Sequence, residues 1–330
     1  MFRVTSPTKM DDRQLNRLIK RVVLLLIVGT VLFVGFYALD RWRPATEPIV
    51  DRRVSALEQA VRDDPEDIVS RGQLADTYVA KGMFDEAIVQ YNLILETDKE
   101  TELATYGRAG AYVGLGQLDA AAKDYQAVVE IAKGGEMAHV DPMLQAAYYG
   151  LGSIAMQQGK PAEAIPFLEK ALAIKSSDAD TLYLIGTAYV ATGETDKAEK
   201  ALRNAVAFVP IGWSEPYTAL AEGFTKAGQT AMAEWAGAMA DLAAGAPELA
   251  EPRLLAIVEG DAAVDAAIGL GLLYETKGDS ATAAGWYGKA LATSPDNAAA
   301  RMGLGRVGAS DGASPLPALP TPGAPAGGSD

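Results

Sequence analysis

The stretch Tyr183–Pro210, YLIGTAYVATGETDKAEKALRNAVAFVP, determines the fold of this chain. It places a small residue, Gly186, seven positions before Gly193, and an alanine, Ala198, five positions after it. Apolar residues on both sides recur at the three- and four-residue spacing of amphipathic helices. The central glycine can adopt a positive φ angle and so ends the first helix without a steric penalty. The stretch therefore predicts two helices that are joined by a tight turn and cross closely at small residues.

The same arrangement recurs along most of the chain. Six turn glycines are separated by 34, 43, 34, 35 and 50 residues, which indicates a 34-residue unit with two insertions and a slip of one residue. The glycines are Gly82, Gly116, Gly159, Gly193, Gly228 and Gly278; the small residues before them are Ala75, Ala109, Gly152, Gly186, Ala221 and Gly271; the alanines after them are Ala87, Ala121, Ala164, Ala198, Ala233 and Ala283. The spacing therefore predicts a repeat array of helical hairpins.

A bulky apolar residue recurs nine positions after the turn glycine, on the face of the second helix that is expected to be buried. The position holds Tyr91, Tyr125, Leu168, Leu202, Tyr287 and, in the fifth unit, Gly237. Residues 136–144 and 248–263 exceed the period, and a proline near the end of the unit is present only at Pro210 and Pro295. The fifth unit therefore departs most from the pattern.

These residues resemble the tetratricopeptide repeat (TPR) family. The resemblance is close over Tyr183–Pro210 and in the preceding unit, where Gly159, Ala164 and the run Phe167–Leu172 match the family pattern. It implies an all-α solenoid of helical hairpins, a TPR superhelix over residues 50–308. The implied units are 68–101, 102–135, 145–178, 179–212, 214–247 and 264–297, with half-units at Leu57–Pro65 and Leu304–Gly305 as caps.

An uncharged segment of eighteen residues, Val22–Leu39, lies between Lys20-Arg21 and Asp40-Arg41. At about 1.5 Å per residue, a helix of this length just spans the hydrocarbon core of a bilayer. The sequence therefore predicts one transmembrane helix, preceded by a cytoplasmic arm at 1–21 and followed by a linker at 40–49. A cleaved signal peptide and a buried globular helix are the alternatives, although no A-x-A-like cleavage site follows the segment.

Charge predicts the orientation of this segment. Six basic residues precede it and four follow it within the nearby linker, so the positive-inside rule favours a cytoplasmic N-terminus. The repeats would then lie outside the cytoplasm. The Ala/Gly-rich, cysteine-free composition suggests a bacterial source, so the predicted localisation is the inner (plasma) membrane, in a single pass.

The chain is strongly acidic beyond its first 43 residues. Those residues hold 8 of the 29 basic and 3 of the 43 acidic residues, which leaves 21 basic against 40 acidic residues and a balance of −19. Such a surface repels nucleic acid and favours basic or neutral partners, although solubility alone also explains acidity. We therefore expect no nucleic-acid partner.

The sequence contains no recognisable catalytic, cofactor or metal site. His139 is the only histidine and cysteine is absent, so neither a histidine dyad nor a cysteine-ligated metal can form. Gly150–Ala155 mimics a dinucleotide-binding fingerprint, but it lies within a predicted first helix with no strand before it. We therefore predict a protein that is not an enzyme.

The TPR resemblance implies a partner-binding groove on the concave face, lined by the first helix of each unit. Tyr106, Tyr149 and Tyr183 occupy one position in three successive units, an arrangement that suits contact with an extended peptide. Ordinary repeat packing explains tyrosine there equally well. The other groove residues that the resemblance implies are Asp76, Val113, Ser153, Met156, Thr187 and Val190.

Residues 309–330 are rich in Pro, Ala, Gly and Ser, which predicts a disordered tail. The tail contains a P-x-x-P sequence, Pro317–Pro320, which we interpret as part of a flexible segment because no reader for it is evident.

Two functional hypotheses follow. The first is a membrane-tethered scaffold or adaptor that holds a protein or extended peptide in the groove and assists assembly or chaperoning at the membrane. The alternative is a constitutive structural subunit of a larger membrane complex, in which a neighbour fills the groove permanently. Exchangeable peptide binding would favour the first, and copurification in fixed stoichiometry the second.

Overall fold

A computed structural model of the chain describes residues 49–207 and 210–308, together with Lys20, Leu26, Thr30 and Phe33. The predicted membrane span, Val22–Leu39, therefore lies outside the described residues except at three positions, and the predicted tail lies outside them entirely. Within the described ranges, no helix has both the length and the apolar content needed to cross a bilayer.

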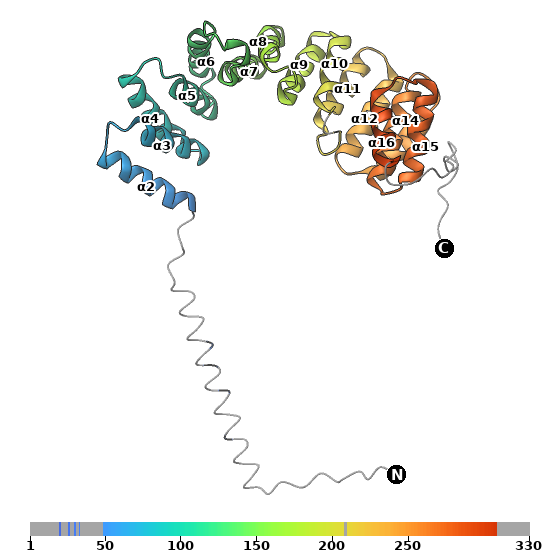
Figure 1. Cartoon of the computed structure of the whole chain (residues 1–330), viewed down its shortest axis with the longest axis horizontal. Helices are drawn as coiled ribbons and strands as arrows, with labels where there is room; N and C mark the ends of the chain where they lie inside the picture. Colours follow the sequence, from blue (N-terminus) through green and yellow to red (C-terminus); the bar gives the residue numbers. More distant parts are fainter. Residues whose placement is uncertain are drawn as a thin grey trace. The chain divides into compact units, whose positions relative to one another are not determined.

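The described residues form fifteen α-helices, one short 3-10 helix and no β-strand, which confirms the all-α prediction (Figure 1). A first helix, α2, is followed by five hairpins, one extra helix, a sixth hairpin and a final helix. The bounds are α2 Ile49–Asp63, α3 Ile68–Ala80, α4 Phe84–Thr97, α5 Glu102–Gly114, α6 Leu118–Ala132, the 3-10 helix Ala138–Val140, α7 Pro142–Gln157, α8 Pro161–Ile174, α9 Ala179–Thr192, α10 Thr195–Ala205, α11 Glu215–Lys226, α12 Thr230–Ala243, α13 Pro247–Ala256, α14 Ala263–Thr276, α15 Ser280–Thr293 and α16 Ala298–Gly308.

Internal contacts divide the chain into two units, Met1–Asp63 and Asp64–Asp330. In the first unit, α2 carries polar links along its own surface, including a 2.7 Å hydrogen bond that Gln59 donates to Asp63. In the second unit, each α-helix packs against the next α-helix along the chain, as expected for a solenoid. The pairs α3/α4, α5/α6, α7/α8, α9/α10, α11/α12 and α14/α15 are the six predicted hairpins.

The turn glycines adopt the backbone conformation that the sequence predicts. All six have positive φ angles between 70° and 82°, a region that residues with a Cβ atom rarely occupy. The small residues of the first helices also lie at close crossings: a Cβ atom at Gly152 or Gly186 would stand 2.5 Å from the side chain of Leu168 or Leu202. The large residue of the second helix thus fills the space that glycine leaves on the first.

The fifth hairpin meets its neighbour differently, because the insertion 248–263 contains the extra helix α13. This helix packs against α12. At Gly237, the position that is bulky in the other units, an added Cβ atom would stand 2.4 Å from a guanidinium nitrogen of Arg253. That guanidinium pairs with Glu234 at 2.6 Å and with Asp241. An arginine from α13 therefore occupies the space next to Gly237.

Candidate functional site

The three tyrosines predicted to line the groove lie on successive first helices, α5, α7 and α9, and each is half-buried. The ring of Tyr106 lies 5.5 Å from that of Tyr125, and the ring of Tyr183 meets Trp213 edge-on at 5.4 Å. Each ring therefore packs on one side and is partly open to solvent on the other.

Carboxylates at the start of the first helix of the following hairpin lie near two of these tyrosines. Burial raises the pKa of Tyr149, and the negative charges of Asp180 and Asp178 raise it further. Burial also raises the pKa of Tyr183, with a contribution from Glu215. This face therefore combines half-open aromatic rings with negative charge.

The first-unit groove residue, Asp76, is exposed and accepts a 2.6 Å hydrogen bond from the hydroxyl of Tyr91. It lines a pocket of about 300 Å³ between α3, α4 and the start of α5. Three exposed apolar side chains, Ile68, Val69 and Leu103, lie in the wall of this pocket. The structure thus places Asp76 in an open, largely apolar hollow.

The remaining predicted groove residues differ in accessibility. Ser153 and Thr187 are half-buried and hydrogen-bond within their own helices, to Gln157 at 3.3 Å and to the Leu184 carbonyl at 2.7 Å. The other three are Val113 and Met156, which are half-buried, and Val190, which is 6% exposed. Val190 belongs to the main hydrophobic core, so its side chain is not available to a ligand in this structure.

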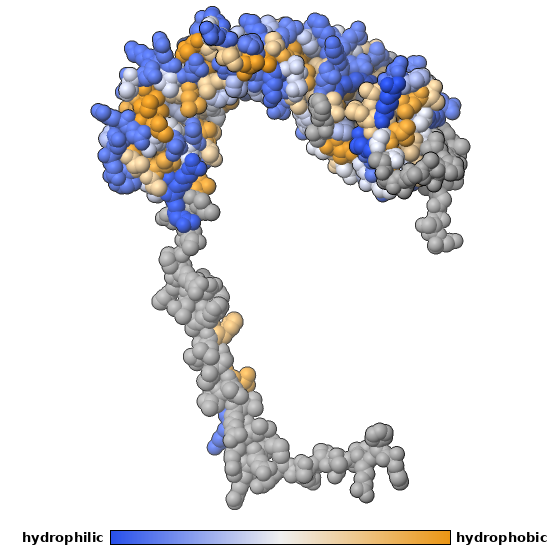
Figure 2. Space-filling model, viewed as in Figure 1, coloured by the Kyte–Doolittle hydropathy of each residue, from blue (hydrophilic) through white to orange (hydrophobic). Residues whose placement is uncertain are grey.

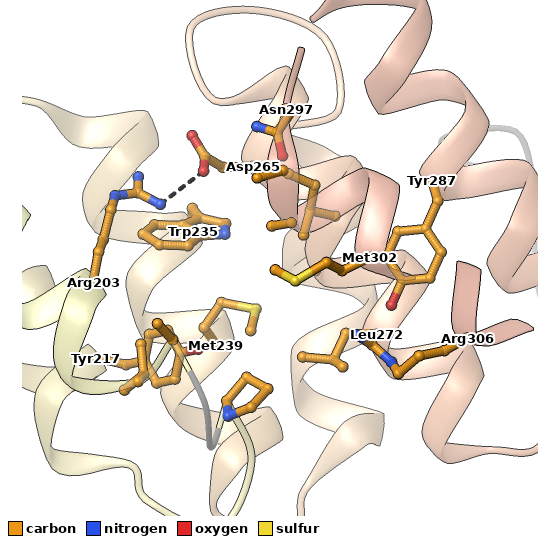
Figure 3. Close-up of a pocket in the computed structure, with 17 residues that line it drawn as sticks. Arg203, Tyr217, Trp235, Met239, Asp265, Leu272, Tyr287, Asn297, Met302 and Arg306 are labelled. Atoms are coloured by element: carbon orange, nitrogen blue, oxygen red, sulfur yellow. Dashed lines mark hydrogen bonds and ion pairs between the residues drawn. The ribbon is translucent and has the colours of Figure 1, made fainter. Parts of the chain in front are cut away.

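A second site, which the sequence did not predict, lies among α10, α11, α12, α14, α15 and α16 (Figure 3). We call it the C-terminal pocket, and its volume is about 340 Å³. Its wall is mainly apolar and aromatic, and Met302 of α16, which is 58% exposed, reaches between Trp235 and Tyr287. The side chains that shape it most are Tyr217, Trp235, Met239, Leu272, Tyr287 and Met302.

The charged groups of the C-terminal pocket are neutralised by one another. Arg203 stacks over the Trp235 ring at 4.2 Å and pairs with Asp265 at 2.9 Å and with Glu199 at 2.8 Å. Arg306 pairs with Glu275 at 2.7 Å. The pocket therefore offers an apolar space in which no arginine lacks a carboxylate partner.

One polar group of the C-terminal pocket has no partner. Trp235 is 5% exposed, and its indole nitrogen has no hydrogen-bond acceptor in the part of the chain that the structure describes. Figure 3 shows this nitrogen on the side of the ring that faces the middle of the pocket. The adjacent Tyr217 is buried, which raises its pKa to about 12, so its hydroxyl is neutral at physiological pH. A buried N–H without an acceptor is uncommon and marks the site for attention.

The described residues contain no cluster of three or more histidine, aspartate or glutamate side chains that could hold a metal ion. Aromatic and apolar side chains make up most of the lining of the C-terminal pocket, and this lining supports binding through apolar contacts. Figure 2 shows hydrophobic patches between hydrophilic residues along the visible face of the described residues.

Comparisons with known proteins agree with this architecture. Residues 155–210 match one tetratricopeptide repeat profile, and residues 73–136 and 236–298 match a second. Together the matched residues make up more than half of the chain. No curated protein matches the sequence.

Several solved structures share the arrangement of helices. BtubC from P. vanneervenii is 20% identical, with a TM-score of 0.51, over 61% of this chain and 93% of that one. The C-terminal part of a TPR repeat-containing protein from Cytophaga hutchinsonii is 18% identical, with a TM-score of 0.50, over 77% and 94%. A MamA protein is 24% identical, with a TM-score of 0.47, over 53% and 90%. At these identities the likeness to the first two shows the fold alone.

Proposed function

Because the chain belongs to the tetratricopeptide repeat family, we propose that it is a membrane-tethered scaffold that binds an extended protein segment along its first helices. The observation that carries this proposal is the row of half-open tyrosines, Tyr106, Tyr149 and Tyr183, on α5, α7 and α9. Half-buried aromatic rings have little side-chain entropy to lose and gain contact area when a ligand covers them.

The charges beside these rings indicate the chemistry of the partner. The negative charges of Asp178 and Asp180 raise the pKa of Tyr149, and the charge of Glu215 raises the pKa of Tyr183. Negative charge therefore lies beside the row of tyrosines. A partner segment with apolar and basic side chains complements such a surface and would be attracted to it over long range. We therefore expect the partner to be a protein segment that contains lysine or arginine.

Membrane tethering rests on the uncharged segment Val22–Leu39 and on the excess of basic residues before it. We propose that the N-terminus is cytoplasmic and that the repeats lie outside the cytoplasm. A reporter enzyme that is active only outside the cytoplasm, fused after Val307, should then be active. An inactive fusion, or a mature N-terminus found beyond residue 39, would contradict this topology.

Photo-crosslinking in cells tests the binding surface. A photoreactive amino acid at Ser153, between the helix positions of Tyr149 and Met156, should form an adduct with the partner. The same amino acid at Glu163, an exposed residue at the start of α8, serves as the control and should not. Substitution Tyr149→Ala should weaken the Ser153 adduct, by about fivefold for a loss of ~1 kcal/mol of binding.

The same experiment separates an exchangeable partner from a permanent subunit. If the partner exchanges, the adduct at Ser153 should decrease when excess unlabelled partner segment is added after it has been identified. An adduct of fixed stoichiometry that survives this competition would favour a constitutive complex. Equal crosslinking at Ser153 and Glu163, unaffected by Tyr149→Ala, would refute the proposed groove.

A further inference from the structure

We propose that the C-terminal pocket binds a segment of this chain itself, Pro315–Pro320 of the C-terminal tail, in cis. The segment reads Pro-Leu-Pro-Ala-Leu-Pro and contains no charged residue. It holds the only two leucines of residues 309–330 and three of their five prolines. It is therefore the part of the tail with the most apolar surface to bury.

The composition of the pocket fits such a segment. Trp235, Tyr217 and Tyr287 supply aromatic surface, and Met239, Leu272 and Met302 supply apolar surface. Aromatic-lined grooves are the usual binding surface for proline-rich peptides, because extended proline-rich chains lose little conformational entropy on binding. Met302, an exposed apolar side chain on the last helix, would be covered by the bound segment.

The unpartnered indole of Trp235 gives a second, independent reason. A polyproline II segment has no internal hydrogen bonds, so its backbone carbonyls are free to accept. The Trp235 nitrogen is on the side of the ring that faces the pocket, and no acceptor reaches it among the described residues. The nitrogen itself is fully buried, so a carbonyl of the tail segment reaches it only when the side chains around it shift on binding. Such a carbonyl would then satisfy an N–H that otherwise costs free energy.

The charges that line the pocket also favour an uncharged ligand. Arg203 and Arg306 both have carboxylate partners, so neither arginine is free to attract an acidic ligand. The rest of the chain beyond residue 43 carries a balance of −19, yet the tail between Gly312 and Ser329 has no charge. An uncharged segment therefore matches a pocket whose arginines are already paired.

The length of the chain permits the contact. Helix α16, which lines the pocket, ends at Gly308, and Met302 lies about 9 Å back along its axis. The seven residues from Gly308 to Pro315 span up to ~23 Å when extended. The segment can thus return to the pocket within one chain.

Indole N–H resonances of the full chain in detergent test the proposal. The chain has four tryptophans, and the Trp235 signal is assigned with Trp235→Phe. We expect the variant Leu316→Ser/Leu319→Ser to shift the Trp235 signal and to speed its exchange with solvent. Trp286 is the internal control, because its indole nitrogen is also buried without a partner but does not line the pocket.

A matched tail variant and a peptide complete the test. Ala324→Ser/Ala326→Ser adds the same two hydroxyl groups outside the segment and should leave the Trp235 signal unchanged. A synthetic peptide of residues 312–323 should restore the signal in the leucine variant. It should bind the wild-type chain about tenfold more weakly, because a tethered segment competes at millimolar effective concentration.

Three results would overturn the proposal. The first is a Trp235 signal that is the same in the wild type and in the leucine variant. The second is an equal shift of the Trp235 and Trp286 signals, which would mean a general change of packing. The third is a shift that disappears on dilution of the wild-type chain, since the occupant would then come from a second copy.

Discussion

The hairpins α3–α10 and the joint between α12 and α13 belong to one array of repeats, yet the helices at that joint meet in the opposite way. In the first region a large residue of a second helix fills the space beside a small one, as Tyr91 does at Gly107. At the joint between α12 and α13 the sizes are exchanged, because Gly237 is small and Arg253, also sixteen residues later, is large. The comparison shows that a repeat can keep its residue spacing while the small and the large residue of a contact change places between the two helices.

The two regions also differ as binding surfaces. The aromatic row on α5, α7 and α9 is half-open and lies beside carboxylates, whereas the C-terminal pocket is a mainly apolar hollow in which both arginines are paired. The first surface is suited to a charged partner that approaches from solution. The second is suited to a neutral apolar segment.

The largest expected effect comes from removing one arginine in each region. Arg108 donates to Asp124 at 2.7 and 2.8 Å and to Asn92 at 2.6 Å, and the Asp124 side chain is only 11% exposed. Arg108→Met leaves this carboxylate unpaired and should lower the local stability of α5/α6 by about 3 kcal/mol. Arg253→Met should cost at most ~1 kcal/mol, because Glu234 and Asp241 remain partly solvated.

Hydrogen exchange of the individual helices measures both effects, because an array of repeats opens locally. Arg108→Lys retains the charge but not the paired donors and should lie between the wild type and Arg108→Met. If Arg108→Met and Arg253→Met lowered the local stability equally, the two arginines would be equivalent, which would contradict the difference proposed here between the two regions.

The next effect comes from one substitution made in both regions. Gly186→Ala places a Cβ atom 2.5 Å from the buried Leu202 side chain and should destabilise α9/α10 by about 1–3 kcal/mol. In Gly237→Ala the clash is with the end of the Arg253 side chain, which can move, and alanine favours the helix. We therefore expect a change within ~0.5 kcal/mol, measured by exchange in α12. A loss at Gly237 as large as that at Gly186 would contradict this.

A smaller effect is expected from salt, which should change binding at the aromatic row but not at the C-terminal pocket. A synthetic peptide that alternates leucine and lysine should associate with the aromatic row several-fold more slowly as ionic strength rises, because its long-range attraction is screened. The Trp235 indole signal, which reports occupancy of the C-terminal pocket, should not change over the same range. A salt-independent rate would mean that the carboxylates do not guide binding.

The smallest effect is on the acid stability of the contact between α14 and α16, which Glu275 and Arg306 join. Hydrogen bonds from Arg306 hold the pKa of Glu275 below its ordinary value of 4.5. A lowered folded-state pKa stabilises the fold above the ordinary value, and this contribution is lost as pH falls through the folded-state pKa. Exchange in α16 should therefore accelerate below about pH 4.5. Glu275→Gln should remove this dependence, and an unchanged pH profile in that variant would show that other groups cause it.

The sequence predicted the regular part of the fold because each rule concerned residues close in the chain. Turn glycines, small crossing residues and bulky partners repeat at fixed separations, so Gly193 and Ala198 identify a hairpin without tertiary information. The substitution of glycine for a bulky residue at Gly237 was visible too. Its physical explanation was not, because Arg253 lies in an insertion for which the repeat gives no register.

The candidate sites were predictable to a different extent. The positions of Tyr106, Tyr149 and Tyr183 on successive first helices follow from the period alone. The burial of Val190 does not, since it depends on how closely α11 packs against α9. The C-terminal pocket was missed because its wall comes from six helices, and no local pattern brings Arg203 to Asp265 across 62 residues.

The exchange of sizes at the joint between α12 and α13 limits how the chain can be cut and recombined. A hairpin taken from α3–α10 presents a small residue to the helix before it, so grafting it after α12 would place two small residues opposite each other at Gly237. The cavity would have to be filled by a compensating mutation. Helices α12 and α13 should therefore be transferred together when repeats are recombined. Hybrids in which the chain is cut between these two helices should fold poorly.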